Sequence, residues 1–128
     1  MSRPGNGTRL LPLALAALLL GGCATPDGAE APPASVELRG HLMLGPQERA
    51  FRPCNSADSL WLLAAPALDA QLQERYLSQV DEPYEEAYLH LRGQRGAAAD
   101  CSACAGHAGS LRIEQLIELR SAESADCR

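Results

Sequence analysis

A short apolar run near the N-terminus constrains this chain more than any other feature. Residues 10–20 read LLPLALAALLL, with Arg3 and Arg9 before them and no acidic residue anywhere in residues 1–22. As a helix this run would rise about 16 Å, roughly half the hydrocarbon core of a bilayer, so it is too short to cross one. A basic start, a short apolar run and then small residues together predict a secretory signal peptide over residues 1–22.

The residues that end the apolar run predict a lipid anchor. Leu20-Gly21-Gly22-Cys23 resembles the lipobox of bacterial lipoproteins, in which small residues before the cysteine let the signal peptidase approach. By this resemblance Cys23 is acylated, with fatty acids such as palmitate, and becomes the first residue of the mature protein. Two or three acyl chains make release from a membrane negligible. The alternative is an ordinary signal peptide cut elsewhere, with Cys23 incidental.

The segment after the cysteine bears on location and on where folding begins. Ala24 follows Cys23, whereas in enterobacterial lipoproteins an Asp there favours retention in the inner membrane. Its absence favours the outer membrane, with the protein facing the periplasm. Residues 23–35 are small and Pro-rich without a large apolar side chain, which predicts a flexible tether. We therefore expect one folded domain over residues 36–128.

Alternation of apolar and polar residues predicts strands in this domain. Val36, Leu38, Gly40, Leu42 and Leu44 share one face of an extended segment, and a period of two is typical of a half-buried strand. Similar patterns, or short apolar runs between turn residues, recur along the chain. The expected strands are residues 36–44, 49–54, 60–63, 87–93 and 111–119.

The period changes once. Leu68, Leu72 and Tyr76 recur every four residues, which predicts one amphipathic helix over residues 67–78. Residues 94–110 are rich in Gly and Ala and are expected to form a long loop. For residues 111–119 a helix is the alternative, because Leu, Glu and Gln are good helix formers.

The order of these elements points to a fold class. Three strands, one helix and two further strands are the order of an OB barrel. We therefore expect a mainly β domain with one helix, folded as a small five-stranded OB-like barrel.

A family resemblance points the same way. The chain carries Leu38-Arg-Gly40, then Phe51-Arg-Pro-Cys54, a helix ending Gln73-Glu-Arg-Tyr76, the stretch Tyr84–Gly93 and a terminal Cys127. This series resembles the C-terminal OB-fold domain of the NlpE-type lipoproteins of copper homeostasis and adhesion, over about residues 36 to 127. In that family the Cys-x-x-Cys lies in another barrel, so we do not transfer its function to the Cys-x-x-Cys of this chain.

Five cysteines need an account. If Cys23 carries lipid, Cys54, Cys101, Cys104 and Cys127 remain, and four cysteines allow three pairings. Export to an oxidising compartment lets disulfides persist. The NlpE resemblance implies the pair Cys54 and Cys127, which leaves Cys101 with Cys104.

The stretch Cys101-Ser-Ala-Cys104-Ala-Gly-His107 is the one constellation with potential chemistry, and three interpretations stay open. The first is a disulfide that stiffens the loop, with no cofactor. The second is a copper or zinc site, in which two thiolates and the imidazole of His107 are the ligands, joined in space by His41 or His90. The third is thiol exchange, which the neighbouring Asp100 disfavours because it would raise the thiol pKa.

The remaining signals narrow the function class. The formal net charge is −5 and the sequence has no lysine and no basic stripe, so nucleic acid is not an expected partner. His41 and His90 fall on outer strand faces, where we expect surface residues. No Ser, His and Asp order and no phosphate loop is present. We expect a non-enzymatic envelope lipoprotein that binds a ligand or other envelope proteins or senses stress, with a copper- or zinc-binding protein as the alternative.

Overall fold

The computed structural model describes residues 2, 5, 7, 22 and 34–128. Cys23 and nearly all of the predicted signal peptide and tether lie outside these residues. The chain divides into two units, Met1–Glu30 and Ala31–Arg128, and the fold is that of the second. Within the described ranges, no helix combines the length and the apolar character that crossing a bilayer requires.

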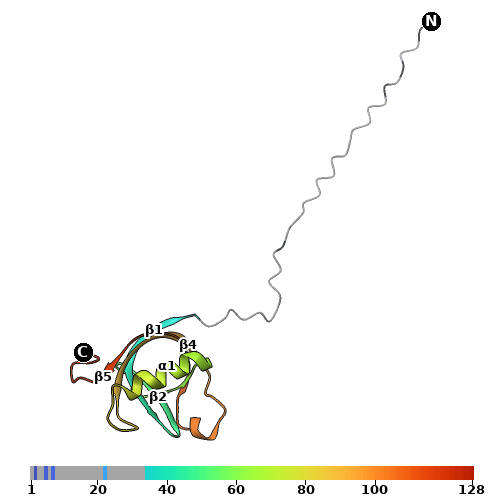
Figure 1. Cartoon of the computed structure of the whole chain (residues 1–128). Helices are drawn as coiled ribbons and strands as arrows, with labels where there is room; N and C mark the ends of the chain where they lie inside the picture. Colours follow the sequence, from blue (N-terminus) through green and yellow to red (C-terminus); the bar gives the residue numbers. More distant parts are fainter. Residues whose placement is uncertain (1, 3–4, 6, 8–21, 23–33) are drawn as a thin grey trace. The chain divides into compact units, whose positions relative to one another are not determined.

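The second unit is a closed five-stranded barrel with one α-helix, which confirms the predicted OB-like fold class (Figure 1). Around the barrel the strands follow the order β1-β2-β3-β5-β4. All neighbours are antiparallel except β3 and β5, which are parallel. The elements are β1 (Val36–Gly45), β2 (Glu48–Pro53), β3 (Leu60–Leu63), α1 (Pro66–Leu77), β4 (Ala87–Gly96), a single 3₁₀ turn (Ser102–Cys104) and β5 (Gly109–Ser121).

The core lies inside the barrel and is mostly leucine. Side chains that alternate along the strands meet there, as the period of two predicted for the first strand. Phe51 is its one phenylalanine, and α1 adds Leu72 and Tyr76 from one side. The fully buried large side chains are Tyr76, Phe51, Leu42, Leu62, Leu72, Leu89, Leu91 and Leu111.

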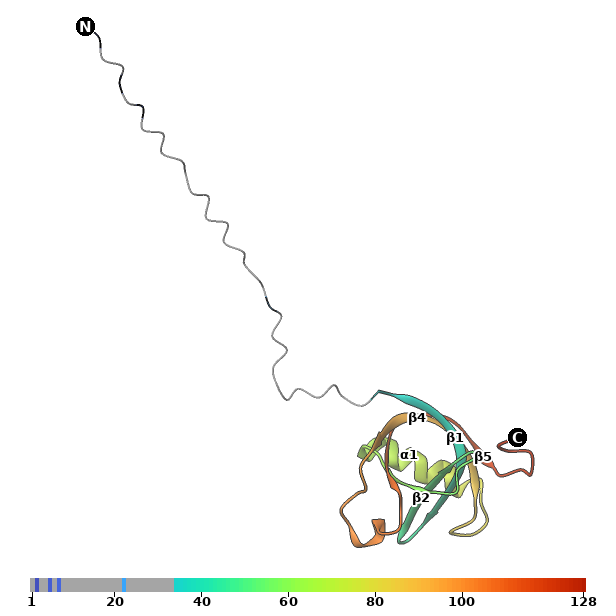
Figure 2. The same cartoon turned by 180° about the vertical axis from the view of Figure 1, so that it is seen from behind.

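The helix α1 lies against the curved sheet in both views (Figures 1 and 2). Pro66 occupies its first turn, where the missing N–H costs nothing. The hydroxyl of Tyr76 donates a hydrogen bond to the carbonyl oxygen of Glu85 at 2.5 Å, and burial raises the pKa of this tyrosine. Arg49 on β2 forms an ion pair with Asp69 in the first turn of the helix. These contacts fix the helix to β2 and to the segment before β4.

Two glycines allow a close approach of strands, one between β1 and β2 and the other between β4 and β5. A Cβ on Gly40 of β1 would overlap the carbonyl oxygen of Arg52 on β2, and one on Gly93 of β4 would overlap that of Arg112 on β5. Glycine is the residue that tolerates such backbone contact. Both positions belong to the motifs that carry the family resemblance.

The last strand differs from its prediction in detail. It is a strand, so the helical alternative is wrong, but two register shifts against β4 lie between His90 and Leu91 and between Arg92 and Gly93. Each shift is a bulge that inserts one residue into β5 and bends it. Strict alternation from Leu111 predicts Ile117 on the buried face, but Ile117 is 39% exposed, and Leu116 packs against the core instead.

The predicted loop is shorter than expected. Hydrogen bonding between β4 and β5 extends to Gly96 and Ser110, so residues 97–108 alone connect the two strands. A strand pair can continue through small residues when its backbone partners are in place, which composition does not reveal. We call residues 97–108 the β4–β5 loop.

Candidate functional site

The β4–β5 loop contains the Cys-x-x-Cys pair as a disulfide. Cys101 and Cys104 are bonded, with their Cα atoms 5.1 Å apart. Cys104 is buried and Cys101 is exposed. The backbone N–H of His107 donates to the carbonyl oxygen of Cys104 at 3.3 Å, which links the disulfide turn to the histidine.

His107 is the best-anchored side chain of this loop. Its Nδ1 lies 2.8 Å from Oγ of Ser59, just before β3, and its Nε2 lies 2.9 Å from Oε1 of Glu48, the first residue of β2. The ring also packs edge-on against Trp61 at a centroid distance of 5.4 Å. These contacts leave only 7% of the His107 side chain exposed.

The chemistry of the partners determines the protonation pattern of the neutral imidazole. A carboxylate cannot donate a proton, so its contact with Nε2 at 2.9 Å favours the tautomer that has the proton on Nε2. The other nitrogen, Nδ1, is then an acceptor and receives the hydroxyl proton of Ser59. The Ser59 hydroxyl, the His107 imidazole and the Glu48 carboxylate therefore lie in series, joined by one hydrogen bond and one close polar contact.

These three residues border a hollow of about 250 Å³ on the outer face of β1 and β2, beside the segment that leads into β3. Arg52 and Glu86 cross its rim as an ion pair at 3.0 Å, about half exposed. Small apolar side chains and a methionine complete it. The lining residues are His41, Met43, Glu48, Ala50, Arg52, Ala57, Ser59, Glu86 and His107. We refer to this site as the β1–β3 hollow.

The residues predicted as a metal site do not come together as one. The sulfur atoms of Cys101 and Cys104 are joined to each other, and both nitrogens of His107 face Ser59 and Glu48. Among residues 34–128 no group of three His, Cys, Asp or Glu side chains is arranged to hold a metal ion. The oxidised loop thus has the geometry of the first interpretation, a stiffening disulfide.

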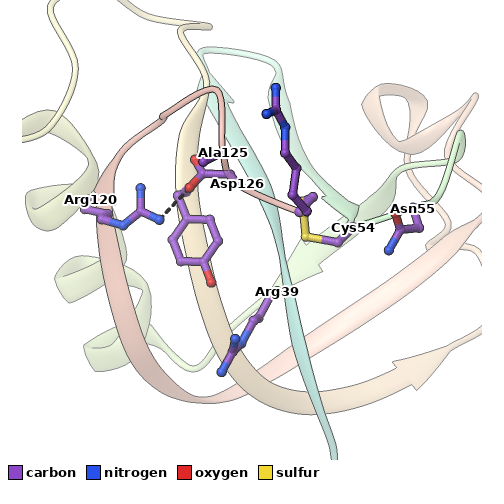
Figure 3. A pocket seen from close by; sticks show the side chains of 9 residues that line it. Arg39, Cys54, Asn55, Arg120, Ala125 and Asp126 are labelled. Atoms are coloured by element: carbon purple, nitrogen blue, oxygen red, sulfur yellow. Dashed lines mark hydrogen bonds and ion pairs between the residues drawn. A yellow bond between two sulfur atoms is a disulfide. The ribbon is translucent and has the colours of Figure 1, made fainter.

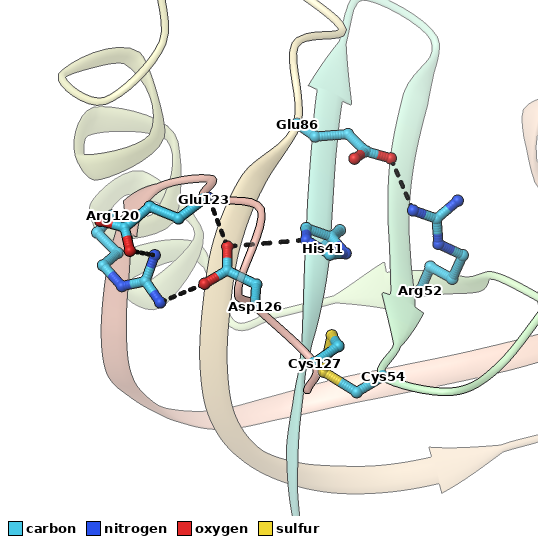
Figure 4. Close-up of a disulfide and its surroundings, with 8 residues drawn as sticks. All are labelled: His41, Arg52, Cys54, Glu86, Arg120, Glu123, Asp126 and Cys127. Atoms are coloured by element: carbon cyan, nitrogen blue, oxygen red, sulfur yellow. Dashed lines mark hydrogen bonds and ion pairs between the residues drawn. A yellow bond between two sulfur atoms is a disulfide. The ribbon is translucent and has the colours of Figure 1, made fainter.

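The second disulfide joins the end of the chain to the barrel wall. Cys54 and Cys127 are bonded with a Cα separation of 5.0 Å, the pairing that the NlpE resemblance implies (Figure 4). Beside it, Asp126 accepts a hydrogen bond from Arg120 at 2.5 Å and one from the Glu123 N–H at 2.7 Å. These bonds, the one from Arg120 first, hold the pKa of Asp126 below its usual value despite burial.

The two other histidines differ from the surface residues that we expected. His90 is buried, and its Nε2 lies 2.5 Å from Oε1 of Glu37 on β1, so the surface prediction is wrong for this residue. His41 is partly covered by the C-terminal segment, with its Nε2 3.8 Å from Asp126 (Figure 4). Alternation gave the correct face in both cases but did not show that other segments cover that face.

A second cavity, of about 320 Å³, lies beside the Cys54–Cys127 bridge (Figure 3). Arg39, Tyr88 and Arg120 line it, and the Arg120 guanidinium stacks on the Tyr88 ring at 4.0 Å. The charge of Arg120 is already balanced by Glu118 and Asp126, which it contacts at 3.1 and 2.5 Å. We therefore place the candidate site in the β1–β3 hollow.

Comparison with known proteins adds no relative. No family model, no curated protein and no solved structure matches the chain.

Sequence reasoning missed two residues of the candidate site. Ser59 and Glu48 lie 48 and 59 positions before His107 in the chain, and such sets are recognised by geometry and not by order. The position of Ser59 after a turn and before a short strand was the only available signal. His107 was singled out, but for its neighbouring cysteines and not for its actual partners.

Proposed function

We propose that this chain is a lipoprotein of the bacterial cell envelope, held by acylated Cys23 at the periplasmic face of the outer membrane. The barrel acts there as a binding or envelope-stress-sensing module, akin to the NlpE-type domain. Support comes from the small residues before Cys23, from the Pro-rich residues that follow, and from two disulfides, which an exported domain can keep.

The observation that carries the binding role is the β1–β3 hollow. OB barrels bind their ligands on the face of their second and third strands, between the loops that flank it. The hollow is lined by β1, β2 and the segment before β3, so it borders this face, and the β4–β5 loop supplies His107 to its wall. An ion pair on the rim and small apolar side chains suit a small polar ligand.

Metabolic labelling tests the anchor. Cells fed radiolabelled palmitate should label the wild-type chain and leave the Cys23→Ala variant unlabelled. A Cys101→Ala/Cys104→Ala double variant serves as the matched control and should keep the label. Equal labelling of wild type and Cys23→Ala, or no label in either, would remove the anchor from the proposal.

Fluorescence tests the hollow. Trp61 is the one tryptophan of the chain and contacts His107, so a ligand in the hollow should change its emission. The full lipoprotein in detergent is titrated with glycan and peptide fragments released from the envelope, beside an Ala57→Leu variant that fills the hollow. A saturable change in wild type alone supports the site; no change in wild type with any fragment class contradicts it.

The metal-binding alternative requires a different state of the loop. The cysteines would have to be reduced and His107 would have to leave Glu48 and Ser59. Titration of the oxidised and the reduced protein with Cu(I) under chelator competition addresses it. Submicromolar binding to the reduced form alone would revive this role, and weak binding in both states removes it.

A further inference from the structure

We propose that Ser59, His107 and Glu48 form a hydrolytic relay that cleaves short-chain acyl esters bound in the β1–β3 hollow. This inference goes beyond the binding role and opposes the expectation of a non-enzymatic protein. It rests on the proposed function only in using the same hollow, and it needs neither the anchor nor a particular partner.

Ser59 and His107 have the geometry of a nucleophile and its base. A serine hydroxyl is a weak nucleophile until an adjacent base accepts its proton, and the two must lie within about 3.2 Å. Oγ of Ser59 and Nδ1 of His107 are 2.8 Å apart. Because the Glu48 carboxylate lies 2.9 Å from Nε2 and favours the proton there, Nδ1 is the basic nitrogen.

Glu48 orients the base, His107. Oε1 of Glu48 lies 2.9 Å from Nε2 and accepts a hydrogen bond from the backbone N–H of Arg49 at 3.1 Å, which fixes the carboxylate beside the ring. A carboxylate in this position holds one tautomer and stabilises the imidazolium that forms. In the familiar serine–histidine–aspartate arrangement serine faces Nε2 and the acid faces Nδ1; here the nitrogens are exchanged, which leaves the chemistry of the ring the same.

The hollow gives a substrate access to Ser59 and carries a guanidinium in its lining. Ser59 is partly exposed and lines the hollow, so a substrate can reach it. Arg52 is the one arginine in the lining and gives a hydrogen bond to Glu86 at 3.0 Å. A guanidinium has five N–H donors, so further ones remain for a developing oxyanion. Met43, Ala50 and Ala57 give this hollow of about 250 Å³ an apolar part that suits a short acyl chain.

The proposed reaction balances with water as the sole co-reactant. The Ser59 oxygen bonds to the ester carbonyl carbon while its proton moves to Nδ1 of His107. The carbon–oxygen bond to the alcohol breaks, and the alcohol leaves with that proton. Water then attacks the acyl-serine, gives one proton to Nδ1, and releases the carboxylic acid as Ser59 recovers its proton. His107 and Ser59 are the catalytic residues, and Glu48 is a positioning residue.

Covalent labelling tests the relay directly. The full lipoprotein, oxidised and in detergent, is treated with a fluorophosphonate probe and mapped by mass spectrometry. We expect labelling at Ser59 about 100-fold faster than at Ser102, an exposed serine of the β4–β5 loop that serves as the internal control. Ser59→Ala should abolish the fast labelling, and Ser102→Ala should leave it unchanged.

Turnover of p-nitrophenyl acetate and the Glu48 variants separate a relay from a structural clamp. Glu48→Gln should slow both labelling and turnover about 100-fold, while Glu48→Asp, which keeps the carboxylate, restores much of the rate. Labelling of Ser59 no faster than Ser102, or turnover that Ser59→Ala leaves intact, overturns the proposal. Either result leaves the palmitate and fluorescence tests of the proposed function unaffected, so the two can fail separately.

Discussion

The two disulfides constrain two very different regions of the barrel. Cys54–Cys127 spans 73 positions and fixes the C-terminal segment against β1 and β2, whereas Cys101–Cys104 spans 3 positions within the β4–β5 loop. The first region is also secured by Asp126 and Arg120, and the second by His107. The long bridge therefore stabilises the whole fold, and the short one shapes the wall of the candidate site.

The largest expected effect is the loss of the long bridge. Cross-linking positions so far apart removes much unfolded-chain entropy, so Cys54→Ala/Cys127→Ala should lower the free energy of unfolding by about 4 kcal/mol. Guanidinium denaturation of the oxidised protein measures it. A loss below that of the short-bridge variant would break the comparison.

Asp126 should give the next largest effect. Asp126→Asn removes a charged hydrogen bond to Arg120 from a side chain that is 2% exposed, and we expect a loss of about 2 kcal/mol. Since the folded pKa lies below the ordinary value near 4, the stabilisation is complete above that pH and is lost as the pH falls below it. Denaturation between pH 2 and 7 checks both statements; the variant should lose part of the acid dependence, and an unchanged slope contradicts the assignment.

Loss of the short bridge should matter less. Cys101→Ser/Cys104→Ser releases a closed segment of only 3 positions, so the free energy of unfolding should fall by less than about 2 kcal/mol. The same denaturation experiment measures it, with wild type and the long-bridge variant as references. A loss as large as that of the long bridge would mean that the loop, and not the C-terminal segment, holds the barrel together.

The smallest effect is local to the loop. Ser59→Ala removes one hydrogen bond to His107, about 1 kcal/mol, which should speed amide exchange in the loop about fivefold. The Ala108 N–H, bonded to the Ser59 carbonyl oxygen at 3.0 Å, is the reporter. Hydrogen exchange should rise there and stay constant at Arg128, whose N–H bonds within the C-terminal segment. Equal acceleration at both sites would show that the two regions are coupled.

Most of the fold could be predicted because apolar and polar side chains alternate along strands that are buried on one face. Alternation predicts β1 over Val36 to Leu44, and a four-residue spacing predicts α1 at Leu68, Leu72 and Tyr76. Each periodicity requires one backbone geometry. The two bulges of β5 could not be predicted, because a bulge depends on the partner strand. Alternation alone therefore assigns Ile117 to the buried face, although its side chain is exposed.

The candidate site could be predicted only in part. His107 stands out beside its cysteines, but the sequence is silent on which side chain will face each ring nitrogen. Glu48 and Ser59 reach it only after β2, β3 and the β4–β5 loop are packed together. The burial of His90, which contacts Glu37, could not be predicted for the same reason. Alternation predicts the face on which His90 lies but not which side chains cover that face.

Peptide mapping of the purified, unreduced protein tests the account most directly. Mass spectrometry should find Cys23 as the N-terminal residue carrying acyl chains, Cys54 linked to Cys127, and Cys101 linked to Cys104. This result would support the anchor and both regions compared above in one measurement. An unmodified Cys23 inside an uncut N-terminal peptide, or Cys23 in a disulfide with any other cysteine, would contradict it.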